Sequence, residues 1–337
     1  MEKGSMCGRI KKITIFMAFF LLVIALFFNY FSYEIAKSRL IEGYSGVRTN
    51  DLRSRPYMMQ NIIEGQIDVF RAKYPSRYDG QEFKSSLNEL MQPHGDTNSG
   101  FVKGILYINE EGISELSTDV SWEGAGEDYS GELFFYELKA GKPIFIQDGG
   151  KAGGREIIFS VPVLADDGSS GSASFKGAFL VRLDAEKIFD LVLGPINSKK
   201  TPEIAAVLNN DGVLIYHHDK KLVGINYKDY VIEKGIPSSI QLMNSSLEGK
   251  EGYGTYSYPH SKGEYIGKGN VKKVVVYAPM DLGEIRWSLW VTIPVEELEK
   301  YSGFSQVMML ILFNMFMIIV FFAIIVSTFF LLCSRII

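Results

Sequence analysis

Two long apolar runs stand near the two ends of the chain. Ile13–Phe31 and Val307–Leu332 carry no charged residue. A helix rises about 1.5 Å per residue, so each run is long enough to cross the roughly 30 Å hydrocarbon core of a bilayer. We therefore predict transmembrane helices at 13–31 and 307–332, short tails at 1–12 and 333–337, and a large region, 32–306, between the helices.

The first apolar run has a second interpretation, a cleaved signal peptide. The apolar core of such a peptide would be only about 7–15 residues long and would precede small residues at the cleavage site. Here Glu34 and Lys37 flank the one suitable alanine, Ala36. The pattern favours an uncleaved span.

Polar residues in the second run leave two alternatives open. They are Asn314, Ser327 and Thr328. Hydrogen bonds from them to a partner helix would favour a homodimer through the membrane. Equally, the serine and threonine hydroxyls can bond to the backbone of their own helix.

Basic residues set the expected orientation of the chain. Lys3, Arg9, Lys11 and Lys12 precede the first span, and basic flanks remain on the cytoplasmic side of a membrane. We expect both termini in the cytoplasm and residues 32–306 on the periplasmic or extracellular side of a bacterial inner (cell) membrane.

The region between the spans begins with a helical pattern. Met59, Ile63, Ile67, Phe70 and Tyr74 recur at spacings of three and four, which places them on one apolar face of a long helix. Gly43, Gly46 and Pro56 are expected to kink or interrupt its upstream part. A second, shorter helix is expected at 83–91.

Short β-favouring runs then predict two groups of strands. In the first group we expect strands at 101–109, 113–116, 144–147, 155–164 and 176–184 and helices at 133–138 and 185–193, closed by Gly194 and Pro195. In the second we expect a hairpin at 205–216, strands at 252–257, 264–268, 271–279 and 287–293, and helices near 237–246 and at 296–301. The clearest turn is Asn209–Gly212, whose residues reach positive φ cheaply. The order predicts an α+β fold with two mostly antiparallel modules in tandem, a membrane-distal one at about 75–195 and a proximal one at about 196–300.

Composition and charge narrow the function. The 337 residues are 47% hydrophobic and 22% charged with a net charge of −4, which is typical of a folded protein and does not indicate a nucleic-acid partner. Cys7 and Cys333 both lie in the tails. The central region therefore has no disulfide framework.

We find no catalytic or metal-binding constellation in the sequence. His217 and His218 are adjacent in a predicted strand and so point to opposite faces, while His94 and His260 stand alone. The glycine-rich run 149–154 lacks the Gly-Lys-Ser/Thr ending of a phosphate loop. We expect no enzyme activity, no metal and no cofactor.

Several short motifs stand out in the central region. The distal ones are Asp128–Ser130, Ala140–Pro143, Ser160–Val163 and Gly177–Leu183, and the proximal ones are Asn210–Gly212, Val223–Gly224, Tyr277–Pro279 and Trp287–Leu298. Together they resemble the double Cache (PAS-like) sensor domain of bacterial chemoreceptors and sensor histidine kinases. The resemblance covers 32–306. It implies tandem PAS-like modules on a long N-terminal helix between the two transmembrane helices, and small-molecule sensing in chemotaxis or a two-component system.

The resemblance also implies a ligand site between the distal sheet and a capping loop, here Trp122–Tyr136. The candidate ligand-binding residues are Trp122, Asp128, Tyr129, Glu132, Tyr136, Phe145, Arg155 and Arg182. Amino-acid-binding members carry an arginine where this chain has Glu132 and an aspartate where our alignment puts Arg182. Both charges are reversed, so the resemblance points away from an ordinary amino acid.

Arg182 is a planar double donor that suits a small organic anion. Other interpretations stay open: Glu132 attracts an amine, the two side chains form an ion pair with each other, or they are solvated charges on unrelated surfaces.

The output of such a sensor is not evident in the sequence. The tail 333–337 contains no kinase, cyclase or methyl-accepting module. We expect signalling through a cytoplasmic or membrane partner, or a chain that is the sensor half of a truncated receptor. The alternative is a structural or interaction protein of the cell envelope whose outside domain binds another protein; a membrane-anchored enzyme is a weaker third interpretation.

Overall fold

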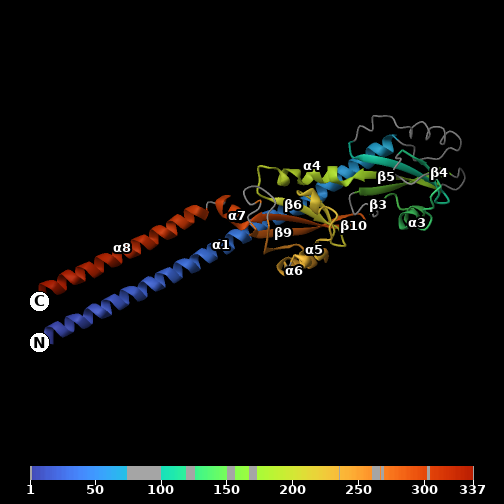
Figure 1. The fold of residues 1–337 in the computed structure, drawn as a ribbon. Coiled ribbons are helices and arrows are strands. Elements are labelled where there is room, and N and C mark those ends of the chain that lie inside the picture. The colour runs from blue at the N-terminus through green and yellow to red at the C-terminus, as the bar shows by residue number, and fades with distance from the viewer. Residues whose placement is uncertain are drawn as a thin grey trace. The chain divides into compact units, whose positions relative to one another are not determined.

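The computed structural model describes residues 2–73, 100–118, 126–149, 156–166, 173–234, 236–259, 266, 269–301 and 304–336. These residues form two compact units, one made of 1–46 and 294–337 and the other of 47–293. Each unit has its own architecture (Figure 1).

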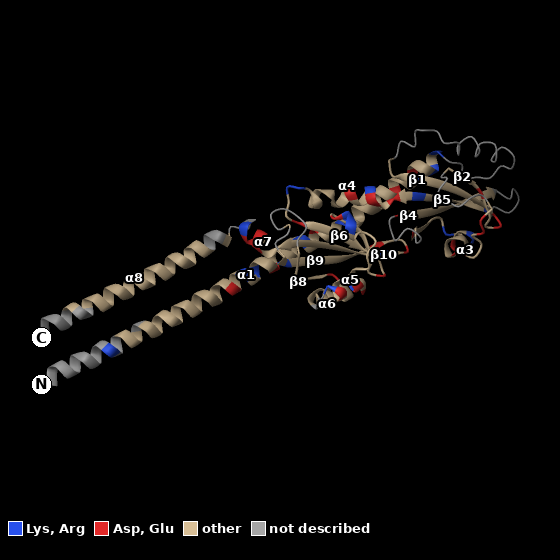
Figure 2. Ribbon diagram, viewed as in Figure 1, with Lys and Arg blue, Asp and Glu red and all other residues tan. Residues whose placement is uncertain are grey.

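Helices dominate the unit formed by the two ends of the chain. It contains the first part of α1 (Glu2–Lys73), α7 (Val295–Tyr301) and α8 (Phe304–Ile336). Both long helices have an apolar window that could cross a membrane, with mean hydropathies of 2.3 and 3.0. Their ribbons are almost free of charged residues over the predicted spans (Figure 2), and the two chain ends lie at the same end of the unit (Figure 1).

Contacts within this unit lie at the other end of the two apolar runs. The Tyr33 and Phe304 rings are 5.5 Å apart, and Lys37 Nζ lies 2.7 Å from Glu299 Oε1. In α8, the Thr328 hydroxyl donates to the carbonyl of Ile324 in the same helix. For Thr328, the interpretation as a bond to its own backbone is therefore confirmed.

One prediction about the long helix is wrong. α1 continues without interruption through Gly43, Gly46 and Pro56. Proline removes one backbone donor and crowds the preceding turn, but the residues around it are anchored by tertiary packing. Leu52 and Met59, on either side of Pro56, are both fully buried.

The unit 47–293 holds the predicted α+β modules. The distal sheet contains β1 (Val102–Asn109), β2 (Ser114–Ser117), β3 (Phe145–Asp148), β4 (Glu156–Asp166) and β5 (Ala173–Asp184). The proximal sheet contains β6 (Ile204–Leu208), β7 (Leu214–His217), β8 (Gly252–Pro259), β9 (Asn270–Leu282) and β10 (Ile285–Pro294). The helical elements are α3 (Leu133–Lys139), α4 (Ala185–Asn197), the 3₁₀ turn η2 (Lys220–Leu222), α5 (Tyr227–Glu233) and α6 (Pro237–Leu247).

The two sheets repeat one topology. Their strand orders are β2-β1-β5-β4-β3 and β7-β6-β10-β9-β8, and the strand pairs are antiparallel. The predicted α+β fold with two modules is confirmed. The predicted helix 83–91 lies outside the described residues, and so does the predicted strand 264–268 except for residue 266, which is in a turn.

The helix predicted at 185–193 extends further than predicted. α4 runs through Gly194 and Pro195 to Asn197. The Asn197 side chain donates to the carbonyl of Ala205 at 3.1 Å and accepts from its N–H at 2.8 Å. These contacts with the next strand hold the last turn of the helix, and local sequence does not reveal them.

The same turn opens both modules. The Asn209 side chain accepts from the N–H groups of Asp211 and Val213, at 3.1 and 2.8 Å, and Gly212 has a φ of +78°. In the distal module the Asn109 side chain accepts in the same way from the N–H groups of Glu111 and Ile113, at 3.1 and 3.0 Å. Gly112 there has a φ of +89°. Glycine suits both positions because it reaches positive φ without steric cost.

Each sheet has two covered faces. On the distal sheet, Phe70 of α1 packs against Phe159 and Phe179, with ring centroids 5.8 and 5.3 Å apart; α3 covers the opposite face. On the proximal sheet, Phe189 of α4 packs against Tyr216, and α5 and α6 cover the opposite face. The face under α3 and the face under α5 and α6 occupy corresponding places in the two modules.

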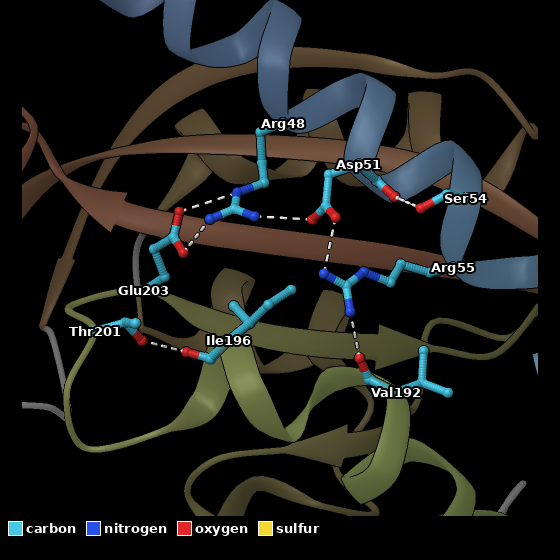
Figure 3. A network of polar contacts seen from close by, with 8 residues as sticks. All are labelled: Arg48, Asp51, Ser54, Arg55, Val192, Ile196, Thr201 and Glu203. Carbon is cyan, nitrogen blue, oxygen red and sulfur yellow. Dashed lines mark hydrogen bonds and ion pairs between the residues drawn. The ribbon is translucent and has the colours of Figure 1, made fainter. Parts of the chain in front are cut away.

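A polar network joins α1 to the boundary between the modules (Figure 3). Arg48 contacts both carboxylate oxygens of Glu203, just before β6, and donates to Asp51 at 2.8 Å. Arg55 donates to Asp51 at 2.8 Å and to the carbonyl of Val192 in α4 at 2.6 Å. Side chains of one helix therefore hold both the end of the distal module and the start of the proximal one.

Candidate functional site

Two of the predicted distal site residues, Trp122 and Arg155, lie outside the described residues. Asp128 and Tyr129 lead into α3. The Asp128 carboxylate accepts from the N–H of Ser130 at 2.8 Å, and hydrogen bonds from the Ser130 hydroxyl and N–H lower the pKa of Asp128. The Tyr129 hydroxyl donates to Glu127 at 2.8 Å, and its ring lies 6.2 Å from that of Phe134.

The structure separates the next three predicted residues. Glu132 is exposed at the N-terminus of α3 and makes no side-chain capping bond. Tyr136 is also exposed. Phe145 is buried in the core, and Lys142 Nζ lies 4.6 Å from its ring centroid. Of these two predicted aromatic site residues, Tyr136 therefore lies on the surface and Phe145 in the core.

On β5, the Arg182 side chain points to the same face of the sheet as Ala178 and Leu180. These two residues belong to the apolar core under α3. The carboxylate that the structure places beside it is Glu156 on β4, with Arg182 Nε 3.5 Å from Oε2. Lys103 Nζ is 3.3 Å from the other oxygen of Glu156. Burial lowers the pKa of Arg182. The ion pair considered between Glu132 and Arg182 is therefore replaced by one within the sheet.

The face of the distal sheet under α3 is filled with apolar side chains. Phe134, Phe135 and Leu138 of α3 pack there with Phe145 and Leu180 of the sheet. All of them are at most 3% exposed. The helix rests directly on the sheet in this region.

The proximal module differs at the corresponding face. A cavity of about 290 Å³ lies between the sheet and the segment that runs through η2 and α5. Its walls are aromatic and aliphatic, with Tyr227, Tyr230, Tyr256, Tyr258 and Trp290 as the rings. Four polar side chains also line it, namely His217, Asp219, Lys273 and Thr292. A small pocket with apolar walls and few polar groups is the usual form of a small-molecule site.

The strand register explains why these side chains meet. Tyr256 on β8 pairs with Lys273 on β9, and Tyr258 is two residues further along, so it points to the same face. Trp290 and Thr292 follow the same alternation on β10. Tyr227 and Tyr230 come from consecutive positions on one side of α5, spaced by three residues.

Lys273 is the most unusual group in the cavity. Its side chain is 4% exposed, and Nζ donates to the carbonyl of Pro259 at 2.8 Å. The ring centroids of Tyr258 and Tyr256 are 5.4 and 5.8 Å from Nζ. Burial lowers the pKa of Lys273 to about 7.

His217 adds a neutral donor. Its Nδ1 accepts the N–H of Asp219 at 2.9 Å, so the proton of the neutral ring is on Nε2. Burial lowers the pKa of His217 to about 4. The imidazole is therefore uncharged at neutral pH.

The tyrosine hydroxyls are protonated donors as well. The Tyr258 hydroxyl donates to that of Tyr230. Burial raises the pKa of Tyr227, Tyr256 and Tyr258. The polar lining thus consists of the Lys273 amine, which is about half protonated at pH 7, N–H and O–H donors, and the side chain of Asp219, which accepts from the N–H of Lys221 at 3.1 Å.

Neither this cavity nor its lysine was predicted from the sequence. A usable signal was the spacing of Tyr256 and Tyr258, which puts two aromatic rings on one face of a strand. Lys273 directly follows Lys272, and of two adjacent strand residues the sequence does not show which one points into the protein. Among the described residues, no group of three or more histidine, cysteine, aspartate or glutamate side chains could hold a metal ion.

Comparisons with known proteins agree with this architecture. The sequence model of the Cache domain family matches residues 36–301. No curated protein matches the chain. Many solved structures do, all of those compared being at most 17% identical to this chain.

Three of these structures illustrate the likeness. The ligand binding domain of the Pseudomonas aeruginosa amino acid chemoreceptor PctB, in complex with L-Arg, is 13% identical; the match covers 77% of this chain and 98% of that one, with a TM-score of 0.48. The domain of PctC from the same organism, in complex with GABA, is 13% identical over 74% and 100%, with a TM-score of 0.45. An extracellular ligand binding receptor from Desulfohalobium retbaense is 17% identical over 78% of this chain but only 40% of that one, with a TM-score of 0.41.

Proposed function

The chain belongs to the Cache domain family, and from that membership we propose that its central region is the extracytoplasmic input domain of a two-pass membrane sensor for a small molecule. The observation that carries the proposal is the cavity of about 290 Å³ in the proximal module. It combines apolar walls with a few convergent polar groups, as ligand sites do. A Cache domain is a ligand-binding sensor module rather than a catalytic one.

Membrane placement follows from the helices and their flanking charges. The basic residues before the first span favour a cytoplasmic N-terminus, which puts the modules on the periplasmic side of a bacterial inner membrane. β10 ends at Pro294, and α7 and α8 follow along the chain. Ligand binding that biases the arrangement of the proximal module would thus act on the strand that leads to the second span, and from there on a signalling partner.

The distal anion site through Arg182 is a second part of the proposal. Arg182 lies on the α3 side of the distal sheet, and Glu156 occupies its guanidinium. An organic anion at this position would have to compete with that carboxylate. We therefore place the primary ligand in the proximal cavity and treat the distal arginine as the position to compare with it.

Thermal unfolding of the full chain in lipid nanodiscs tests the sensor proposal. The panel is amino acids, amines, carboxylates and sugars. A ligand at a hundred times its Kd should stabilise the chain by about 2.7 kcal/mol, which is a readily measured rise in Tm. If no member of the panel changes Tm, the sensor proposal fails and an envelope interaction protein becomes the better interpretation.

An Arg182→Ala variant, with Arg286→Ala as its exposed control, separates the two positions. A distal site predicts that the response to a carboxylate is lost in Arg182→Ala and kept in Arg286→Ala. An Arg182→Ala protein whose response is unchanged rules out the distal site and leaves the proximal one.

A further inference from the structure

The proximal cavity contains a buried ammonium group for which the described residues provide no carboxylate in an ion pair. Lys273 lies on β9, between β10 and β8, so its strand is not at the sheet edge. An ammonium group has three N–H donors, and the structure gives Nζ one acceptor, the carbonyl of Pro259 at 2.8 Å. A buried charge without a counter-ion is costly, and such groups gather at functional sites.

The two tyrosine rings beside Lys273 argue against a cationic ligand. Nζ is within 6 Å of the centroids of both Tyr256 and Tyr258, so the protein's own cation already lies against these rings. A second cation would be repelled by the lysine at close range. The carboxylate of Asp219, which could attract one, is hydrogen-bonded at the start of η2.

Other donors favour a ligand that accepts hydrogen bonds. His217 lines the same cavity and carries its proton on Nε2, because Nδ1 accepts from the backbone. The Tyr230 hydroxyl also lines the cavity; it accepts from Tyr258, so its own proton can be donated to a ligand. An acceptor on a ligand would pair these donors, whereas a purely apolar ligand would not.

We infer that the proximal cavity binds a small organic anion, with its carboxylate on Lys273 and its apolar body among the tyrosine rings and Trp290. This inference rests on the proposed sensor function and names the ligand class and the residue that selects it. The volume of about 290 Å³ is at the lower end for ligand pockets, so the ligand carries a single ring or a short chain.

Matched ligands that differ only in their head group test the inference. Benzoate, benzamide and benzylamine form one set, and hexanoate, hexanamide and hexylamine form another. They are titrated in the millimolar range against the full chain in nanodiscs, by tryptophan fluorescence, because Trp290 lines the cavity. Calorimetry checks the result. At least one carboxylate should bind about tenfold or more tightly than its amide and its amine, the size expected for a charge-assisted hydrogen bond.

Variants on the same strand localise the effect. Lys273→Met should weaken carboxylate binding about tenfold or more and leave amide binding unchanged. Lys272→Met removes the same charge from an exposed neighbour and should leave both unchanged. Lys273→Arg, which keeps the charge, should retain a preference for carboxylates even if Lys273→Met does not fold.

Three results would overturn the inference. The first is an amine or amide that binds as tightly as its carboxylate, and the second is an equal loss in Lys272→Met and Lys273→Met. The third is no binding by any of the six compounds. If the metabolite panel then yields a neutral or cationic ligand, the sensor function stands and the anion inference alone fails; if it yields none, both fail.

Discussion

The two modules share a backbone plan but not a binding surface. In each module an Asn-x-x-Gly turn follows the first strand. The backbone N–H of a tyrosine further along the chain then donates to the carbonyl of that glycine at 2.8 Å: Tyr129 to Gly112, and Tyr227 to Gly212. From these matching tyrosines the modules diverge. In the distal module Phe134 and Phe135 pack directly on the sheet, whereas in the proximal module Tyr227 and the rings of β8 enclose a cavity.

This difference shows that repetition of the fold does not decide where a ligand binds. Strand order and turn geometry are the same in both modules. The side chains that face the covering helices are not the same. Apolar ones fill the distal face under α3, with Arg182 on the same side paired to Glu156, whereas on the proximal face Lys273 lies beside the rings of Tyr256 and Tyr258. Binding capacity is therefore a property of a few side chains on a shared scaffold.

The largest expected effect comes from emptying the filled distal face. Phe134 is 1% exposed, so Phe134→Ala should lower the free energy of unfolding by about 3–5 kcal/mol, through lost burial and the cavity left behind. Chemical unfolding of the full chain measures it. Leu133→Ala, at an exposed neighbour in α3, should cost no more than about 0.5 kcal/mol. A loss below about 1 kcal/mol in Phe134→Ala would show that the distal face is less tightly packed than described.

The second-largest effect is expected at the ion pair between Arg48 of α1 and Glu203, which holds the start of the proximal module. Glu203 receives both Arg48 contacts and its side chain is 8% exposed. Glu203→Gln should destabilise the chain by about 2–3 kcal/mol, because the partly buried Arg48 loses the more buried of its two carboxylate partners. The control is Glu251→Gln, at the exposed pair with Arg53, which should cost less than about 1 kcal/mol. Equal losses in the two variants would mean that burial does not strengthen the Arg48–Glu203 pair.

Sequence patterns revealed the scaffold better than the site. The turn at Asn209–Gly212 and most strands were predicted because hairpin chemistry and alternation are local signals. The continuity of α1 through Pro56 depends on packing against residues far along the chain, and so does the pairing of Arg182 with Glu156. Lys273 could not be distinguished from Lys272 by sequence, since only the register with Tyr256 shows which of the two points into the protein.

The smallest predicted effect is a pH dependence of the free energy of unfolding. The buried Lys273 should cause it, and Arg182 of the distal sheet should not. The pKa of Lys273 is lowered to about 7 in the folded chain, against about 10.4 in an unfolded one. Between these values the unfolded chain binds one more proton, so the free energy of unfolding rises with pH, by at most about 1.4 kcal/mol per unit. The titrating groups beside Lys273 do not account for this slope. Burial keeps His217 neutral in this range, and the raised pKa values of Tyr256 and Tyr258 act only above about pH 10 and in the opposite direction.

Unfolding of the ligand-free chain at about pH 7.5 and 8.5 measures this slope. Lys273→Met should lose it and Lys272→Met should keep it, because Lys272 is exposed. Arg182→Ala should also keep it, since an arginine stays protonated throughout this range. Benzoate, which needs the ammonium form, should bind up to about tenfold more weakly for each unit above pH 7 in the wild-type chain. A slope that persists in Lys273→Met would mean that another group titrates in this range, and the proximal cavity would then differ from the distal face in shape but not in charge.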